Sequence, residues 1–290
     1  METSTAPGPA LDVAELRKLR ARHSRRPQDD AWRIEQIAAH LDRHDGYVAF
    51  SGGKDSTIAL HLARQADPNV PVVYYDSGLD YPENHSYINE LADRWDLNLS
   101  IVKAEPSALA ILIGSGAWDH SSPSRPDIGA MLHEAVILEP AQRAHAAHGA
   151  GNIWGLRAAE SPGRAQLFRT ELGRHRRAHC NDSCPCRGDR TATRRVHGGT
   201  VARADGTVSY SPIWNMSDQQ VWDYLGQHQI TPNPVYSKLE RLGAPPHARR
   251  VSMMVDSTAL QIGRMTWLKH GWPHEFAELC RWLPRLREWT

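Results

Sequence analysis

The sequence predicts an α/β protein with a doubly wound, mostly parallel sheet, and three observations predict this fold class. Short apolar runs of strand length at 47–50, 70–75 and 97–101 alternate with longer segments of helical periodicity. The first run ends in a pair of glycines and a helix pattern follows at once. A fourth strand pattern, at 152–156, comes after a further helical stretch. Such alternation favours parallel strands that bind ligands at their carboxyl ends.

Length and composition are those of a globular protein. The 290 residues are enough for a substantial core, 40% of them are hydrophobic, and the mean hydropathy is −0.55. No apolar run approaches the roughly 20 residues of a membrane span, and the N-terminus has no apolar signal segment. Four cysteines are too few for a disulfide framework in a chain of this length. We therefore expect a cytoplasmic protein with no membrane association.

Helical segments are predicted on either side of the sheet domain. Residues 1–45 are expected to form a flexible tail and N-terminal helices, of which the segment 11–26 is basic and the segment 31–41 has one apolar face. The basic run is typical of a solvated helix face, and an arm that binds nucleic acid or a partner is the alternative. The sheet domain is expected at 46–236 and a C-terminal helical segment at 237–290.

The strongest local signal is the stretch Ser51-Gly52-Gly53-Lys54-Asp55-Ser56, which joins a strand pattern to a helix pattern. Its glycines expose backbone N–H groups, and a helix start adds unpaired donors and the positive end of the helix dipole. It is not a Walker A loop, because Val48 and Asp55 stand where that motif needs Gly and Ser or Thr. The stretch predicts a phosphate-binding turn; a glycine-rich turn without a ligand is the alternative.

Two later segments place polar groups at predicted strand ends. Asp76-Ser77-Gly78 follows the second strand, and Gly155 with Arg157 and Arg164 follows the fourth. An aspartate there can orient a ribose or a metal-bound water, and a glycine lets a base approach. Two arginines suit phosphate or sulfate, since guanidinium groups offer paired donors. Taken singly, Asp-Ser-Gly is ordinary turn chemistry and the arginines are ordinary solvated side chains.

In this order along the chain, the segments resemble the PAPS (3′-phosphoadenylyl sulfate) reductase-like family of the PP-loop ATP pyrophosphatase and adenine nucleotide alpha-hydrolase superfamily. The loop at 51–56, the aromatic-Pro-Glu at 81–83, the Gly-Leu-Arg segment at 155–164 and the segments at 212–217 and 232–236 carry the resemblance. It implies a Rossmann-like PP-loop fold, with Lys54, Asp55 and Arg157 as catalytic residues. The implied nucleotide-binding residues are Ser51, Gly52, Gly53, Lys54, Asp55, Ser56, Asp76, Ser77, Gly78, Gly155, Arg157 and Arg164.

The resemblance implies an adenine nucleotide as ligand and leaves the reaction open. In the favoured reaction, ATP with Mg²⁺ is cleaved between its α and β phosphates, which activates an acceptor for sulfur from a donor protein. In the second, PAPS is reduced to sulfite by a thiol that thioredoxin regenerates. The second is disfavoured because the family's Glu-Cys-Gly-x-His tail has no counterpart around the late Cys280, which fits a core position beside Phe276 and Leu283. The third alternative is a non-catalytic accessory, alone or as a homodimer, in a nucleic-acid modification or CRISPR-type defence assembly.

The other cysteines lie in a Cys- and Arg-rich insertion at about 166–209, where the sheet pattern pauses. Cys180, Cys184 and Cys186 could hold zinc or an iron–sulfur cluster, with a fourth ligand from His175, His179, His197 or Cys280. Their C-x₃-C-x-C spacing is not that of a zinc knuckle, so free thiols in a loop are the favoured interpretation. The basic charge of the insertion suits a nucleic acid, a ribonucleoprotein or an anionic sulfur donor; an ordered surface lobe is the alternative.

Overall fold

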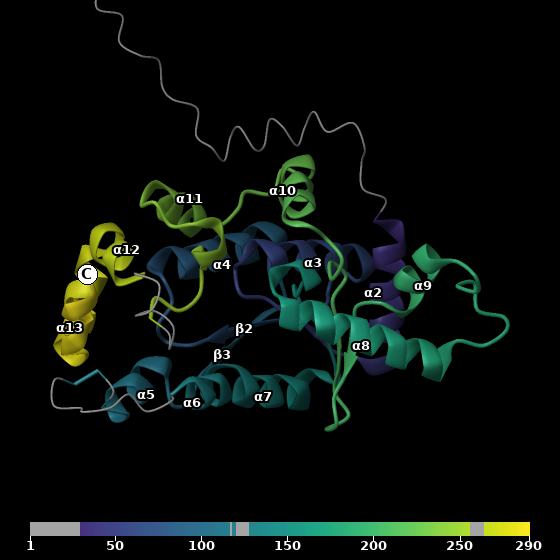
Figure 1. Cartoon of the computed structure of the whole chain (residues 1–290), viewed down its shortest axis with the longest axis horizontal. Helices are drawn as coiled ribbons and strands as arrows, with labels where there is room; N and C mark the ends of the chain where they lie inside the picture. Colours follow the sequence, from purple (N-terminus) through teal and green to yellow (C-terminus); the bar gives the residue numbers. More distant parts are fainter. Residues whose placement is uncertain (1–29, 117, 120–127, 256–263) are drawn as a thin grey trace, which may run out of the picture.

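The structure, a computed structural model, describes residues 30–116, 118–119, 128–255 and 264–290 (Figure 1). The basic helix predicted at 11–26 lies outside the described residues. Within them, six strands form one sheet in the order β3-β2-β1-β4-β6-β5. The strands are β1 (Tyr47–Ala49), β2 (Val72–Asp76), β3 (Leu99–Lys103), β4 (Gly151–Ile153), β5 (Thr200–Ala202) and β6 (Val208–Tyr210). All neighbouring pairs are parallel except β5 with β6, which confirms the predicted α/β class with a mostly parallel sheet.

One face of the sheet is covered by helices whose apolar sides were visible as periodic patterns. In Figure 1, α3, α4 and α10 lie above the strands. Ile37, Ile58, Leu62, Ile88 and Tyr224 from these helices and from α2 are buried in one cluster with the strands. Burying such a stripe is the main source of helix stability in a globular protein. The helices are α2 (Ala31–His44), α3 (Lys54–Ala66), α4 (Pro82–Trp95) and α10 (Asp218–Gln227).

The opposite face is covered by the chain between β3 and β4. Ala144 of α7 packs there against Tyr47 of β1 and Val73 of β2. Helices on both faces are what a doubly wound parallel sheet requires. The covering elements are α5 (Ala108–Gly114), α6 (Gly129–His133), the π-helical turn η1 (Glu134–Leu138) and α7 (Glu139–His148). None of the described helices has the length and apolar content needed to cross a membrane.

The predicted C-terminal helical segment is helical and shares a core with the sheet domain. Leu268, Phe276 and Leu283 are buried in the same cluster as Leu112 and Leu132 from the chain after β3. Glu83 of α4 adds polar links, because it accepts hydrogen bonds from the Lys238 ammonium and the Trp272 indole. The elements are α11 (Pro234–Arg241), η3 (Pro246–Ala248), α12 (Arg264–Gly271), α13 (Pro273–Trp282) and η4 (Pro284–Trp289).

The insertion between β4 and the end of the sheet differs from the prediction. Residues 166–209 were expected to interrupt the sheet, but β5 and β6 form an antiparallel hairpin that extends it. Each strand is only three residues long, and β6 carries a buried serine at its centre, so neither gives a visible apolar run. The insertion also contains most of α8 (Pro162–His179) and all of α9 (Arg190–His197), and η2 (Ala158–Glu160) precedes it.

Two further boundaries can be compared with the prediction. The fourth strand ends at Ile153 rather than 156, because Leu156 and Ala158 bond to Ser211 and Trp214 outside the ladder. The capping box predicted at Ser217 is present: the hydroxyl of Ser217 accepts from the Gln220 N–H, and the Gln220 side chain accepts from the Ser217 N–H.

Candidate nucleotide site

The sheet brings the glycine-rich loop to the point where the chain reverses its winding direction. β1 is the central strand here, with β2 on one side and β4 on the other. A crevice forms at the carboxyl ends of such a pair of strands, because the connections leave in opposite directions. The loop at 51–53 follows β1, and α3 begins at Lys54 with Gly53 as its N-cap. The positive end of the α3 dipole and its unpaired N–H groups therefore lie at this crevice.

A cavity of about 1480 Å³ opens above this loop. Most of the predicted nucleotide-binding residues line it, although three predicted residues do not: Gly52, Asp76 and Gly78. Its wall also includes residues of α7, the β5–β6 hairpin, α10 and the segment 246–253. The predicted residues in the lining are Ser51, Gly53, Lys54, Asp55, Ser56, Ser77, Gly155, Arg157 and Arg164.

One of the two glycines of the loop has a backbone conformation that favours glycine. Gly52 has φ +73°, a value that L-residues rarely adopt, and its N-terminal neighbour Ser51 is exposed. The Ser51 N–H donates to the Ser56 hydroxyl at 3.2 Å, and the two hydroxyls lie 3.1 Å apart. These contacts turn the chain back onto the start of α3, as a phosphate-binding turn requires.

The segment after β2 forms a turn of its own. The Asp76 carboxylate accepts from the Gly78 N–H at 2.9 Å, and Gly78 has φ +72°. Ser77 donates to Asp80, whose carboxylate also accepts from the Tyr74 hydroxyl. Asp76 and Gly78 hold the turn rather than face the cavity, so their contact with a nucleoside stays a prediction.

Arg157 is the centre of a buried ion network. Its guanidinium is 1% exposed and donates to Asp55 at 2.6 Å, to Asp218 at 2.7 Å and to the Met216 carbonyl at 3.3 Å. Burial alone would lower the pKa of Arg157, but the charges of Asp55 and Asp218 outweigh it and raise that pKa. The second Asp55 oxygen is 2.5 Å from the Lys54 ammonium. The network therefore fixes the three predicted catalytic residues relative to one another.

Arg164 lies on the same cavity wall but is held less tightly. Its side chain is 40% exposed and pairs with Glu160 at 2.5 Å. Glu160 also accepts from the Arg157 backbone N–H at 2.8 Å. The two arginines predicted to share one anion thus line one cavity, each with carboxylate partners, and only Arg164 is accessible to solvent.

Gly155 lets the chain after β4 approach the start of α3. A Cβ at this position would lie 2.4 Å from the Ser56 nitrogen and 2.5 Å from the Asp55 carbonyl carbon, both of them backbone atoms. We expect Gly155→Ala to lower the free energy of unfolding by about 1–3 kcal/mol, because overpacking forces the backbone to shift. The same shift would displace the start of α3 and, with it, the predicted phosphate-binding turn.

Gly163→Ala is the matched control for this prediction. A Cβ at Gly163 would meet only the Ser161 hydroxyl, at 4.0 Å. Urea denaturation should give a lower midpoint for Gly155→Ala and a midpoint near wild type for Gly163→Ala. Equal midpoints for the two variants would show that the contact between Gly155 and α3 has room for a methyl group.

The sequence did not predict the buried pair Asn84 and Asn233, whose side-chain amides bond to the backbone of the loop at 51–53. The Asn233 amide donates to the Gly52 carbonyl at 3.2 Å and to Asn84 at 2.7 Å. Asn84, which is 0% exposed, donates in turn to the Ser51 carbonyl and to Asp80. The sequence marks Asn233 only as part of the segment 232–236. Nothing in the sequence marks Asn84, because its hydrogen-bond partners Ser51 and Asn233 are distant along the chain.

Tyr236 is a further residue of the site that the sequence did not predict. Its hydroxyl accepts a hydrogen bond from the Lys54 backbone N–H at 3.1 Å and lines the cavity. Burial raises the pKa of Tyr236, so the hydroxyl stays neutral. This contact occupies one of the N–H groups at the start of α3 until another acceptor replaces it.

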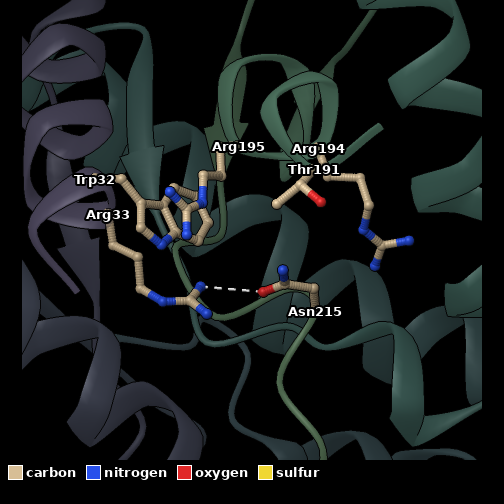
Figure 2. A pocket seen from close by; sticks show the side chains of 6 residues that line it. All are labelled: Trp32, Arg33, Thr191, Arg194, Arg195 and Asn215. Carbon is tan, nitrogen blue, oxygen red and sulfur yellow. Dashed lines mark hydrogen bonds between the residues drawn. The ribbon is translucent and has the colours of Figure 1, made fainter. Parts of the chain in front are cut away.

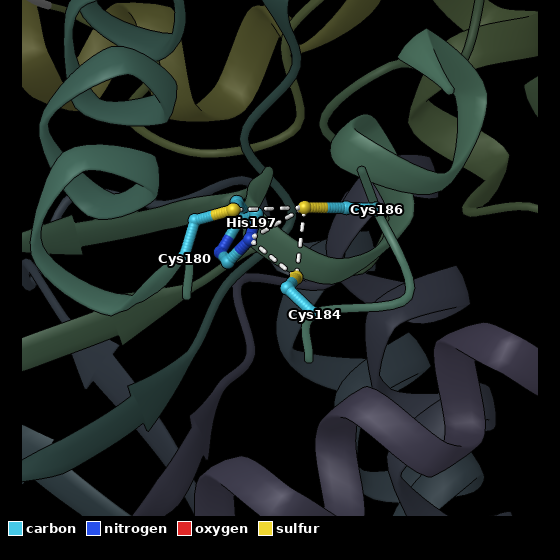
Figure 3. Close-up of side chains that lie close together, drawn as sticks. All are labelled: Cys180, Cys184, Cys186 and His197. Carbon is cyan, nitrogen blue, oxygen red and sulfur yellow. Dashed lines mark hydrogen bonds between the residues drawn. The ribbon is translucent and has the colours of Figure 1, made fainter. Parts of the chain in front are cut away.

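The three cysteines of the insertion meet one of the four proposed partners. Cys180, Cys184, Cys186 and His197, hereafter the Cys₃His cluster, place their ligand atoms within 4.8 Å of one another (Figure 3). A group of this composition can hold a metal ion. Cys280 lies elsewhere, 3% exposed in the core with Phe276 and Leu283, which confirms its predicted core position. Burial raises the pKa of the Cys280 thiol.

Comparison with known proteins identifies relatives along the sheet domain. Residues 46–249 match the family described as "Phosphoadenosine phosphosulfate reductase domain". The phosphoadenosine 5′-phosphosulfate reductase of Yersinia pseudotuberculosis is 25% identical over 218 residues, covering 70% of this chain and 71% of the relative. That of Xanthomonas oryzae pv. oryzae is 26% identical over 212 residues, covering 70% and 72%. The crystal structure of the Candida auris PAPS reductase, a phosphate complex, is similar at 14% identity with a TM-score of 0.48, covering 82% of this chain and 95% of that chain.

Proposed function

The chain belongs to the phosphoadenosine phosphosulfate reductase domain family, and from this premise we propose that it binds an adenine nucleotide in the cavity above the loop at 51–56. Its reaction is the cleavage of Mg²⁺-bound ATP between the α and β phosphates, with transfer of the adenylyl group to an acceptor that then takes up sulfur. The acceptor's oxygen attacks the α phosphorus, and pyrophosphate leaves.

The loop and the start of α3 hold the phosphates. Backbone N–H groups from Gly52 to Ser56 and the α3 dipole favour the negative charge, and Tyr236 gives up the Lys54 N–H when a phosphate oxygen arrives. The Lys54 ammonium, 16% exposed beside the cavity, moves from Asp55 to the leaving phosphates. A pre-positioned cation and backbone donors stabilise the charge that develops in the transition state.

The remaining predicted residues hold the loop and the nucleotide in position. Arg157 is buried and donates to Asp55, Asp218 and the Met216 carbonyl, so it acts by holding Asp55 and the first turn of α3 in place. Arg164 is the accessible arginine of the cavity wall and receives the anionic group furthest from the loop. Ser77, in the lining on the β2 side, lies on the side of the nucleoside, with Asp76 and Gly78 holding its turn.

One observation carries the choice of ATP cleavage over PAPS reduction. All four cysteines of the sequence are described, and none of them lines the cavity. Three lie in the Cys₃His cluster, and Cys280 is buried in the C-terminal core. Reduction of a sulfonucleotide by the protein's own thiol requires a thiolate at the nucleotide. PAPS reduction stays the second candidate, because the relatives named above are PAPS reductases.

Product analysis separates these functions. The full-length protein is incubated with α-labelled ATP, Mg²⁺ and sulfide, and separately with PAPS and reduced thioredoxin. We expect AMP or an adenylylated product together with pyrophosphate in the first reaction, and no sulfite in the second. Sulfite and adenosine 3′,5′-bisphosphate would overturn the proposal in favour of PAPS reduction, and ADP as sole product would exclude α–β cleavage. Tight nucleotide binding without turnover in either reaction would instead indicate a nucleotide-binding accessory, in a nucleic-acid modification or defence assembly.

A further inference from the structure

We propose that the Cys₃His cluster binds one zinc ion, and that this ion holds together the helical part of the insertion, residues 176–197. The inference is independent of the proposed function, because the cluster and the nucleotide cavity lie at opposite ends of α8. Residues 160, 161 and 164 at the start of α8 line the cavity, and Cys180 follows its last residue. An α-helix of 18 residues is about 27 Å long, so the ion cannot contact a nucleotide.

The four ligands come from three pieces of chain that fold toward one point. Cys180 is the C-cap residue of α8, and His197 is the last residue of α9. Cys184 and Cys186 lie in the loop between these helices. Consecutive turns shape this loop, with N–H groups of Cys184, Arg187 and Asp189 donating to the carbonyls of residues 181, 184 and 186. Figure 3 shows all four side chains pointing inward to a common centre.

The spacing of the ligand atoms suits a single ion. Zn–S bonds of about 2.3 Å and Zn–N bonds of about 2.0 Å in a tetrahedron separate the ligand atoms by roughly 3.5–3.8 Å. In the cluster, the sulfurs of Cys184 and Cys186 are 2.7 Å apart and those of Cys180 and Cys186 are 3.2 Å apart. His197 Nε2 lies 3.3 Å from the Cys186 sulfur and 3.4 Å from the Cys184 sulfur, so an ion at the centre would move the sulfurs of Cys184 and Cys186 apart by about 1 Å. An iron–sulfur cluster would place several irons and sulfides between its ligands, and four cysteines are its usual ligand set. Three thiolates and one imidazole that converge this closely favour zinc.

His197 is oriented as a metal ligand. Its Nε2 faces the sulfurs of Cys184 and Cys186, while its Nδ1 lies 3.4 Å from Nδ1 of His175 on α8. Metal-binding histidines usually donate their second ring N–H to an outer partner, which fixes the tautomer and the ring plane. His175 is placed to accept that proton, so it is a positioning residue and not a ligand.

The segment buries little surface of its own. Within residues 176–197, all of which the structure describes, the only buried residues are Cys186 and His197. The apolar cluster that includes Phe168, Val201 and Trp214 lies outside this range, and Arg194 contacts it through its guanidinium, over the Trp214 ring. Segments that cannot bury apolar surface need a cross-link, and a structural zinc ion supplies folding free energy directly.

Zinc would also fix how the insertion meets the N-terminal helix. Helix α9 carries two exposed arginines next to each other, Arg194 over the Trp214 ring at 4.7 Å and Arg195 over the Trp32 ring of α2 at 5.8 Å. Figure 2 shows Arg194, Arg195 and Trp32 around a pocket. Its volume is about 250 Å³, and Arg33 donates to the Asn215 side chain there at 3.1 Å. His197 ends the same helix, so a metal bond at this residue fixes the position of α9 on α2.

Metal analysis of matched histidine variants tests the inference. The full-length protein is purified without an affinity metal, and zinc and iron are measured by mass spectrometry. We expect one zinc per chain in wild type and a loss of at least tenfold in His197→Ala and Cys184→Ser. The control is His179→Ala, an exposed histidine of the same segment that stacks on His175 and should keep its zinc. His175→Ala should weaken zinc affinity by about 10–100-fold without abolishing binding, as loss of an outer-shell partner does.

Two measurements on the wild-type protein keep the test valid if the variants fold poorly. Cobalt(II) in place of zinc should give the intense visible bands of a tetrahedral thiolate site. A strong chelator should increase amide hydrogen exchange in 176–197 and leave exchange in β1 and α3 unchanged. Iron with a charge-transfer spectrum, or no metal uptake from a zinc titration with unchanged exchange, would overturn the proposal. Nucleotide turnover is not a readout in any of these arms, so failure of the proposed function would leave the result intact.

Discussion

We expect Arg157→Ala to lower the free energy of unfolding by about 3–5 kcal/mol, the largest stability effect of any substitution considered. Removing one member of a buried ion network leaves its partners without compensation. Here Asp55, whose side chain is 14% exposed, would lose its 2.6 Å bond to the guanidinium, and the Met216 carbonyl would lose a donor. Nucleotide turnover should fall with stability, since Asp55 and Lys54 would no longer be held at the start of α3.

Asp218→Ala provides the matched control for Arg157. Asp218 binds the same guanidinium at 2.7 Å, but its side chain is 74% exposed. Ion pairs in solvent contribute only about 0–1 kcal/mol, so this variant should unfold close to wild type. Arg157→Lys should resemble the alanine variant, because one ammonium cannot replace three directed N–H donors. Urea denaturation of wild type and the three variants measures these differences. An Arg157→Ala variant whose free energy of unfolding lies within about 1 kcal/mol of wild type would show that the ion network does not stabilise the fold.

Lys54→Ala should lower the rate of the proposed ATP cleavage by about 10²–10³-fold, the loss typical of one group that stabilises transition-state charge. Stability should change little, because the side-chain partner of the ammonium is the adjacent Asp55, which keeps its bond to Arg157. The expected split is therefore a loss of kcat with an unchanged unfolding midpoint. Pyrophosphate release measures the first and urea denaturation the second.

Lys103→Ala controls for the loss of a lysine elsewhere. Lys103 is exposed at the end of β3 and does not line the cavity, so its removal should leave pyrophosphate release unchanged. If Lys54→Ala released pyrophosphate at the wild-type rate, the charge neutralisation assigned to Lys54 would be wrong, although the nucleotide could still bind the loop amides. Equal losses in both lysine variants would point to a general effect of net charge.

The local parts of the site could be predicted from the sequence. The Ser51-to-Ser56 loop, its position between β1 and α3, and the parallel order of the first strands follow from glycine conformation and hydrophobic periodicity. Both are properties of neighbouring residues, so they are visible without tertiary structure. The placement of Cys280 in a core was likewise predictable from its helical spacing to Phe276.

The distant parts could not be predicted, because strand order and helix docking decide which remote side chains meet. Asp55 and Arg157 are 102 residues apart, and Asn84 and Asn233 are 149 apart. The choice of His197 over His175, His179 and Cys280 depends on how the loop after α8 turns back to the end of α9. The β5–β6 hairpin could not be predicted, because a strand of three residues is too short to show an alternating apolar pattern. By itself, then, the sequence determined the phosphate loop and the class of sheet, whereas the ion network around Arg157 and the Cys₃His cluster exist only once the folded chain has brought their members together.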